Sequence, residues 1–319
     1  METRTKVSLA TVGPDDAGRR LDNFLLARLK KVPRSRVYRM IRGGEVRVNG
    51  KRARPDGRLQ AGDQVRIPPV HVEQRAASRS PRVSELNWLR DRVLYEDRDV
   101  LVLDKPAGLA AHGGSGVNFG AIELLRILRQ QPEDLELVHR LDRDTSGCLL
   151  FARRRSALRR LHAQFREGEV RKEYVALLCG RLRGQERFID RPLSVHRRRG
   201  GERHVQVDPE GKPARSRFTP RRRYAEASLV DIVIETGRTH QIRVHAADLG
   251  HPVVGDSRYG GAVSDRLARR LGLQRLFLHA AALSFDSPRN GRVIRVECPL
   301  DDSLRELLDR LDRATAARA

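Results

Sequence analysis

The densest run of polar side chains in the sequence lies between two apolar segments. It reads HRLDRDTSG from His139 to Gly147, with Leu137-Val138 before it and the residues CLLFA after it. Loops held between strands often carry catalytic groups. A carboxylate beside cations stays ionised, so Asp142 could act as a nucleophile or as a general base. A surface turn with salt bridges fits the same residues, and composition does not choose between these interpretations.

A second polar cluster reads TGRTHQIRVH, from Thr236 to His245. The glycine predicts a turn, and the residues after it predict a helix whose first turn offers free N–H groups and positive potential. Arg243 lies one turn along from His240, and its planar guanidinium could hold a carboxylate such as Asp142 through two hydrogen bonds. The alternative is a helix capped by Thr239, with Arg243 in solvent.

Tyr174 is the third candidate, in the segment RKEYVAL. A ring at the start of a strand could stack on a base, although most strand tyrosines belong to the core and keep only the hydroxyl in water. The histidines lack the spacing of metal ligands, and the sequence has neither a Walker A motif nor the glycine motif of dinucleotide-binding folds. We therefore expect no metal and no cofactor.

The elements that must position these groups alternate irregularly between strands and helices. Apolar runs predict strands at 100–103, 148–152, 174–178 and 228–235. Helical spacing predicts helices at 121–129, 156–166 and 239–249, and a last helix that carries Leu304, Leu307, Leu308 and Leu311. The expected class is therefore α+β with a substantial sheet.

A smaller unit is expected at the N-terminus. Apolar spacing predicts a helix from residue 21 that Pro33 stops, and a second helix from about Ser35 to Gly43-Gly44. The second helix has an apolar side with Val37, Met40 and Ile41, and a basic side with Arg34, Arg36, Arg39 and Arg42. The pair Asn49-Gly50 then predicts a type I′ hairpin turn. The arginines could contact phosphates or form only a solvated face.

Charge points to the class of partner. The 319 residues include 64 Lys and Arg against 41 Asp and Glu, a net charge of +23. Such an excess attracts polyanions, so nucleic acid is the expected partner. No apolar leader and no membrane-spanning segment is present, which predicts a soluble cytoplasmic protein. The expected boundaries are an extension at 1–18, an RNA-binding domain at 19–70, a linker at 71–85 and a larger domain at 86–315.

Several of these motifs resemble known families. Residues 20–68, with RMIRGGEVRVNG among them, resemble the S4 domain of ribosomal proteins and RNA-modifying enzymes. The segments HRLDRDTSG, RKEYVAL and GRTHQIRVHAADLGHPVVGDSRYG, together with KPAGL near residue 105, resemble the motifs of the RluA family of pseudouridine synthases. This resemblance covers most of residues 93–300. It implies an α+β catalytic domain with a mixed or antiparallel sheet, preceded by a small S4-type α/β RNA-binding domain.

The resemblance also implies roles for particular residues. Asp142 would be the essential aspartate, Arg243 its ion-pair partner and Tyr174 the ring that packs on the target uracil. Further contacts to substrate or RNA would come from Ile242, Arg140, His240 and the S4 residues Arg34, Arg36 and Arg39. Asp144 falls at a variable site of the motif and receives no role.

The function implied is isomerisation of specific uridines to pseudouridine in 23S ribosomal RNA, free or in a large-subunit assembly intermediate, by a monomer without a cofactor. The uridine is expected to be flipped out of its helix, and Asp142 would either attack the ribose C1′ or remove a sugar proton. Three alternatives stay open: the same chemistry at other 23S sites, a noncatalytic RNA-binding or ribosome-assembly factor, and a metal-dependent RNA hydrolase.

Overall fold

The structure is a computed structural model that describes residues 7–29, 32, 34–70, 81–114, 117–129, 135–197 and 203–317. The chain divides into two compact units, residues 1–79 and 80–319. Of the expected linker at 71–85, residues 71–80 lie outside the described part. Residues 83–85 begin the 3₁₀ helix η2 (Val83–Leu89), which packs against the core of the second unit.

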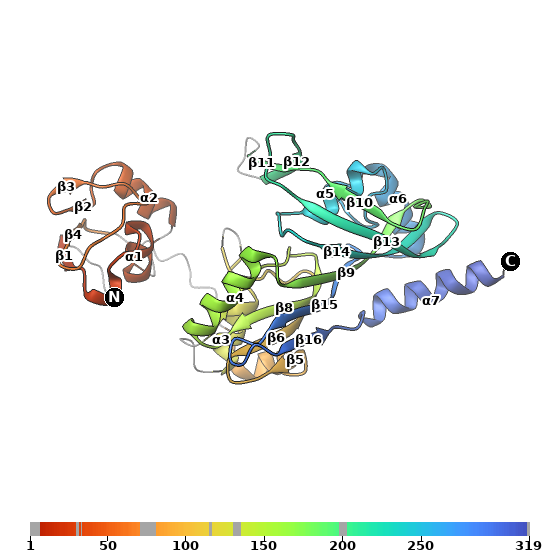
Figure 1. The fold of residues 1–319 in the computed structure, drawn as a ribbon, viewed down its shortest axis with the longest axis horizontal. Coiled ribbons are helices and arrows are strands. Elements are labelled where there is room, and N and C mark those ends of the chain that lie inside the picture. The colour runs from red at the N-terminus through yellow and green to blue at the C-terminus, as the bar shows by residue number, and fades with distance from the viewer. Residues whose placement is uncertain are drawn as a thin grey trace. The chain divides into compact units, whose positions relative to one another are not determined.

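The first unit combines two helices with a small sheet (Figure 1). Its elements are β1 (Ser8–Thr11), η1 (Pro14–Asp16), α1 (Leu21–Arg28), α2 (Arg34–Arg42), β2 (Arg47–Val48), β3 (Lys51–Arg52) and β4 (Gln64–Ile67). The sheet order is β1-β4-β2-β3, with antiparallel pairs throughout. The expected apolar side of α2 is confirmed, because Val37, Met40 and Ile41 are buried. Strand β1 lies within the segment expected as an extension, and it pairs with β4.

The hairpin turn at Asn49-Gly50 is confirmed. Both residues have positive φ, 49° and 75°, as a type I′ turn requires. Asparagine tolerates this conformation, and here its side chain also holds the strand ends. Asn49 Nδ2 donates to Asp63 Oδ1 at 2.8 Å, and its Oδ1 accepts from the backbone N–H of Gln64 at 2.8 Å.

The second unit is built on one large mixed sheet. Its strands are β5 (Val93–Glu96), β6 (Val100–Lys105), β7 (Glu136–Leu137), β8 (Ser146–Ala152), β9 (Arg171–Cys179), β10 (Arg187–Asp190), β13 (Arg215–Arg223), β14 (Ala227–Ile234), β15 (Leu278–Asp286) and β16 (Val293–Glu297). The order is β10-β13-β14-β9-β15-β8-β6-β5, with β16 beside β15 and β7 beside β8. Strands β8 and β15 run parallel and the other pairs are antiparallel. A separate hairpin joins β11 (Leu193–Arg197) to β12 (Arg203–Val207). The expected α+β class with a mixed sheet is confirmed.

Helices cover both faces of this sheet (Figure 1). They are α3 (Ala121–Arg129), α4 (Arg155–Glu167), α5 (Gln241–Asp248), α6 (Gly261–Leu271) and α7 (Asp302–Ala316). Because side chains alternate along a strand, β9 sends Tyr174 into the core cluster that contains α3 and α5, and Val175 into the cluster that contains α6 and α7. Helix α4 packs on a further cluster with alternate residues of β6 and β8. Within the described ranges, every helix is too short or too polar to traverse a lipid bilayer.

A glycine allows the parallel contact between β8 and β15. Gly147, with φ of 108°, pairs with Ala280. A Cβ atom at this position would lie 2.2 Å from the carbonyl oxygen of Ala280, a distance that side-chain atoms do not reach without displacing the strand. The TSG end of the polar run therefore starts a central strand and fixes the loop before it.

Candidate active site

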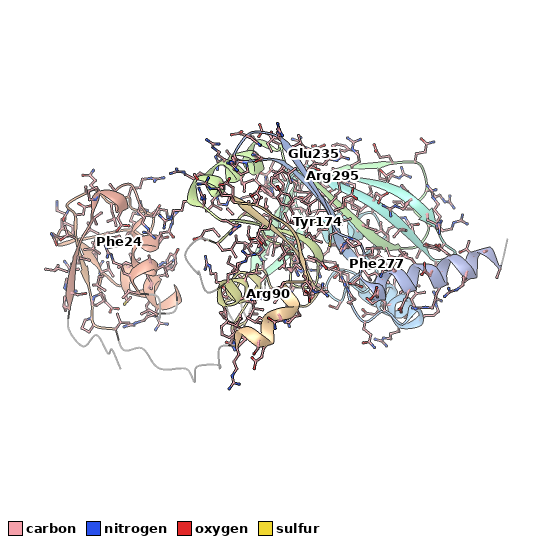
Figure 2. The ribbon with its side chains drawn as sticks, turned by 90° about the horizontal axis from the view of Figure 1, so that it is seen from below. Phe24, Arg90, Tyr174, Glu235, Phe277 and Arg295 are labelled. Carbon is pink, nitrogen blue, oxygen red and sulfur yellow. The ribbon has the colours of Figure 1, made fainter. Side chains whose placement is uncertain are left out.

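A cavity of about 90 Å³ opens on the face of the sheet that carries α3 and α5. Its wall combines the loop before β8, the strands β9, β14 and β15, and the segment from Gly237 into α5. The residues that line it are Arg140, Leu141, Asp142, Thr145, Tyr174, Ile234, Gly237, Arg238, Thr239, His240, Gln241, Ile242, Arg243 and Leu278. Tyr174 is labelled among the strands of the large sheet in Figure 2. The structure thus brings together every candidate that the sequence placed in the second unit.

Arg243 contacts Asp142, but not in the expected manner. Its Nη1 lies 3.7 Å from Asp142 Oδ2, a single long ion pair. The bidentate partner is Asp256, which accepts from Arg243 Nε and Nη2 at 2.7 Å each. The expectation that Arg243 holds Asp142 bidentately is therefore wrong. Two nitrogens of the guanidinium are committed to a buried carboxylate, and the third faces the cavity.

The Arg243–Asp256 pair is buried, with side-chain exposures of 7% and 0%. Burial alone would raise the pKa of Asp256, but the hydrogen bonds and charge of Arg243 and the backbone N–H groups of Tyr259 and Arg258 hold it below its usual value. Burial also acts to lower the pKa of Arg243. The negative charges of Asp256 and Asp142 outweigh this effect, so the pKa of Arg243 is raised overall. Both groups stay charged, so a fixed cation stands beside Asp142, whose side chain is 18% exposed.

Tyr174 and Ile242 form an apolar wall of the cavity. Tyr174 lies on β9, opposite Ile232 of β14. Tyr174 is 9% exposed and Ile242 is 5% exposed. Burial, followed by the negative charge of Asp142, raises the pKa of Tyr174, so the phenol stays neutral. A neutral ring beside an apolar side chain is suited to packing on a planar base.

Gln241 fixes the loop that leads into α5. Its Oε1 accepts from Thr236 Oγ1 at 2.8 Å and from the backbone N–H of Arg238 at 3.0 Å. Its Nε2 donates to the carbonyl of Arg215 at 2.8 Å and to Ser216 Oγ at 2.9 Å. The alternative of a helix capped by Thr239 with Arg243 in solvent is wrong: the residue at the cap position is His240, and Arg243 is buried.

Lys105 fixes the loop that carries Asp142 through hydrogen bonds to backbone carbonyls. Its side chain is fully buried, and Nζ donates to the carbonyls of Pro106, Leu109 and Arg143 at 2.8–3.0 Å. Arg143 Nε in turn donates to the carbonyl of Gly108 at 2.9 Å. The KPAGL segment therefore positions the residue next to Asp142, and its lysine does not enter the cavity.

The candidate arginines of the S4-like domain lie in the first unit. The side chain of Arg34 lies outside the described residues. Arg36 Nη2 is 3.6 Å from Glu45 Oε2, with both side chains well exposed, and Arg39 is exposed. Their contact with RNA stays a prediction.

Sequence reasoning missed two residues around the cavity. Asp256 is the bidentate partner of Arg243. The hydroxyl of Tyr259 is hydrogen-bonded to His240 Nδ1 at 2.7 Å, and the guanidinium of Arg243 lies over the Tyr259 ring, 5.1 Å from its centroid, in a cation–π contact. Both belong to the segment GDSRYG. An aspartate and a tyrosine between two glycines could have marked this segment as a functional loop. The sequence does not show, however, that they contact Arg243 and His240.

His139, at the start of the polar run, makes the stability of the second unit depend on pH. Its Nε2 accepts from the backbone N–H of Leu150 at 3.1 Å and its ring stacks on Phe165. Burial first, and then the charge of Lys172, lowers its pKa from 6.5 to about 4. Between these values the unfolded chain binds more protons than the folded one, so stability falls as the pH falls.

We expect the free energy of unfolding to drop by about 1–3 kcal/mol from pH 7 to pH 4 on account of this group, the range allowing for the partial exposure of the ring. Chemical denaturation at a series of pH values measures it. His139→Gln keeps an acceptor for Leu150 and should flatten the profile; equal slopes for the two proteins would contradict the assignment.

Models of two protein families match the chain. The model described as RNA pseudouridylate synthase matches residues 99–248, and the S4 domain model matches residues 19–65. The first match contains Asp142, Tyr174 and Arg243. The second contains Arg34, Arg36 and Arg39.

The chain is also similar to curated bacterial proteins over almost all of its length. It is 51% identical over 318 residues to ribosomal large subunit pseudouridine synthase C of Escherichia coli, covering 98% of this chain and 100% of the relative. It is 48% identical over 306 residues to the protein of that name from Pasteurella multocida, covering 96% of this chain and 94% of the relative. The solved structure of human RNA pseudouridylate synthase domain containing 4 has a TM-score of 0.60 at 24% identity, covers 72% of this chain and 96% of that one, and shows the shared fold.

Proposed function

Because the chain belongs to the RNA pseudouridylate synthase family, as a ribosomal large subunit pseudouridine synthase of the RluC type, we propose that it isomerises specific uridines of 23S ribosomal RNA to pseudouridine. Membership rests on 51% identity over 98% of the chain. The sequence resemblance to RluA-family synthases with an S4 domain is thereby confirmed. The relatives' name specifies the ribosomal large subunit, and we carry that substrate over to this chain as its 23S RNA.

The observation that supports a catalytic role for Asp142 is its place in the cavity, 3.7 Å from a cation that Asp256 holds in place. In uridine isomerisation the C1′–N1 bond breaks, the uracil turns, and C5 bonds to C1′, so no electron or group donor is consumed. An ionised carboxylate can attack C1′ or take a sugar proton. Tyr174 and Ile242 would pack on the uracil while it turns.

The shape and lining of the cavity support base flipping. It is a local pocket with Tyr174 and Ile242 in its wall and Asp142 beside them, a setting for one planar base rather than for a paired stretch of RNA. We therefore propose that the target uridine leaves its stack to enter, at a cost of a few kcal/mol. Contacts between the basic surface and the RNA backbone would offset that cost, with the S4 domain as a separate anchor on structured RNA.

The test is a map of pseudouridines in ribosomal RNA from cells with and without the gene. We expect specific positions of 23S RNA to lose the modification, and purified protein with a 23S transcript to restore it. Loss at other 23S positions than those expected for an RluC-type enzyme would keep the chemistry and change the target. Unchanged modification, with impaired subunit assembly, would instead support a noncatalytic factor.

A further inference from the structure

His240 adopts a backbone conformation that few non-glycine residues take. Its φ is 54° and its ψ is 18°, in the left-handed region. In the described part of the chain, Asn49 is the other non-glycine residue with positive φ, and asparagine suits that region. Histidine is found there more often than most residues with a Cβ, but the conformation still costs free energy relative to the right-handed region. The strain does not serve the helix, because the His240 side chain makes no capping hydrogen bond to α5. Strained residues that persist cluster at functional sites.

The strained backbone places the ring between Tyr259 and Asp142. His240 Nδ1 lies 2.7 Å from Tyr259 Oη, and Nε2 lies 3.8 Å from Asp142 Oδ2. The second distance is too long for a hydrogen bond. Nε2 therefore faces the cavity beside Asp142 without being bonded to it, while the opposite nitrogen is held by the tyrosine.

The tyrosine determines which nitrogen carries the proton. Tyr259 Oη accepts from the backbone N–H of Val205 at 3.2 Å and is also hydrogen-bonded by the side chain of Arg258. Both of these groups can only donate, so the hydroxyl's own O–H is the group left for His240. Burial raises the pKa of Tyr259, so the hydroxyl keeps its proton and can donate it to His240 Nδ1. With Nδ1 as acceptor, a neutral ring carries its hydrogen on Nε2.

Burial and two neighbouring cations favour the neutral form of the ring. Burial is the largest cause and lowers the pKa of His240. The charges of Arg243 and Arg258 lower it as well, against the opposing effects of Asp142 and Asp256. A neutral imidazole thus presents one N–H to the cavity, next to the carboxylate expected to act on the sugar.

We propose that His240 contacts the substrate through Nε2–H, donating a hydrogen bond to a carbonyl oxygen of the target uracil, and that Tyr259 is the positioning residue that fixes its tautomer. The inference rests on the proposed function. When the C1′–N1 bond breaks, its electron pair stays with the uracil, whose carbonyl oxygens share the negative charge. C1′ is then bonded to Asp142, or shares a double bond with C2′ after Asp142 has taken the sugar proton. A neutral donor stabilises the uracil anion without transferring a proton.

His240→Gly and His240→Asn are the first variants, because both residues tolerate positive φ and neither can reach the base as the imidazole does. We expect kcat on a 23S transcript to fall by about 10²-fold, with little change in KM, since the hydrogen bond strengthens as charge develops. The melting temperature of the glycine variant should equal or exceed that of the wild type, because the strain is relieved. The matched control is His251→Asn, a histidine bonded to the carbonyl of Cys179 and outside the cavity, which should keep wild-type kcat.

Tyr259→Phe tests the positioning role. It keeps the ring on Arg243 and removes only the hydroxyl, so kcat should fall by about 10-fold. Because Tyr259 acts through His240, the double variant with His240→Gly should be no slower than His240→Gly alone. A purely structural tyrosine would give additive losses.

The outcomes separate this inference from the function on which it rests. A wild-type protein without pseudouridine synthesis on ribosomal RNA would overturn the proposed function. An active wild type, with both His240 variants within about twofold of its kcat, would overturn the inference alone. The inference would also be contradicted if both His240 variants lost kcat only in proportion to their loss of folded protein. Additive losses in the double variant with Tyr259→Phe would show that Tyr259 does not act through His240.

Discussion

Asp142→Asn is expected to abolish pseudouridine formation on 23S RNA while leaving the fold intact. Asparagine has the shape of aspartate but no charge, so it can neither attack C1′ nor take a sugar proton, and we expect a loss of about 10⁴-fold or more. The fold should survive because Asp142 is not the group that holds Arg243. Asp256 accepts two of the guanidinium nitrogens at 2.7 Å and keeps the cation in place.

The measurement is release of the C5 proton or direct mapping of pseudouridine in single-turnover reactions, with RNA affinity and melting temperature measured in parallel. The matched control is Asp144→Asn, which changes an exposed carboxylate two residues along the same loop and should retain activity. Turnover by Asp142→Asn near the wild-type rate would remove this residue from the mechanism. Loss of RNA binding or folding together with activity would show that the charge is structural.

Local patterns in the sequence predicted part of the architecture, including four strands of the large sheet and four of the five helices described in the second unit. Helices α2 and α3 begin and end within about a residue of their expected limits, since an apolar side at helical spacing and terminal glycines are encoded locally. Apolar runs located β6, β8, β9 and β14 in the same local way, whereas β15, whose Leu278 lines the cavity, and helix α6 were not predicted. Asp142, Tyr174 and Arg243 could be named because each lies in a recognisable motif, and the structure brings all three to one cavity.

Contacts between distant segments could not be predicted in this way. Asp256 is 13 residues from Arg243 and follows the end of α5, and nothing in the local spacing favours it over Asp142 as the bidentate partner. Lys105 looks like an exposed lysine in a turn, yet it bonds to the carbonyl of Arg143, 38 residues away. Strand β1 could not be predicted from its own residues, because it is defined by its pairing with β4, more than 50 residues away. Such pairs depend on the register of the sheets, which one sequence does not state.

Arg243→Met is expected to reduce both activity and stability, for two separable reasons. It removes the cation beside Asp142, and it leaves Asp256, fully buried, without its partner. Breaking a buried pair on one side costs about 3–5 kcal/mol, because the remaining charge is uncompensated. The double variant Arg243→Met/Asp256→Asn removes that charge and keeps an oxygen for the N–H groups of Arg258 and Tyr259. Its stability should recover, whereas its activity should stay low.

The pH dependence of stability distinguishes the two effects further. In the wild type the pKa of Asp256 is held below 3.8, so its contribution is present above that pH and is lost only as the pH falls through the folded value. Without Arg243, burial would raise this pKa above the unfolded value, and the deficit of Arg243→Met should shrink as the pH falls from 7 towards 4. Chemical denaturation of the three proteins across this range measures the change. A deficit that is constant with pH would mean that the uncompensated charge of Asp256 is not its cause. An active double variant would mean that Asp142 does not require the positive charge at position 243.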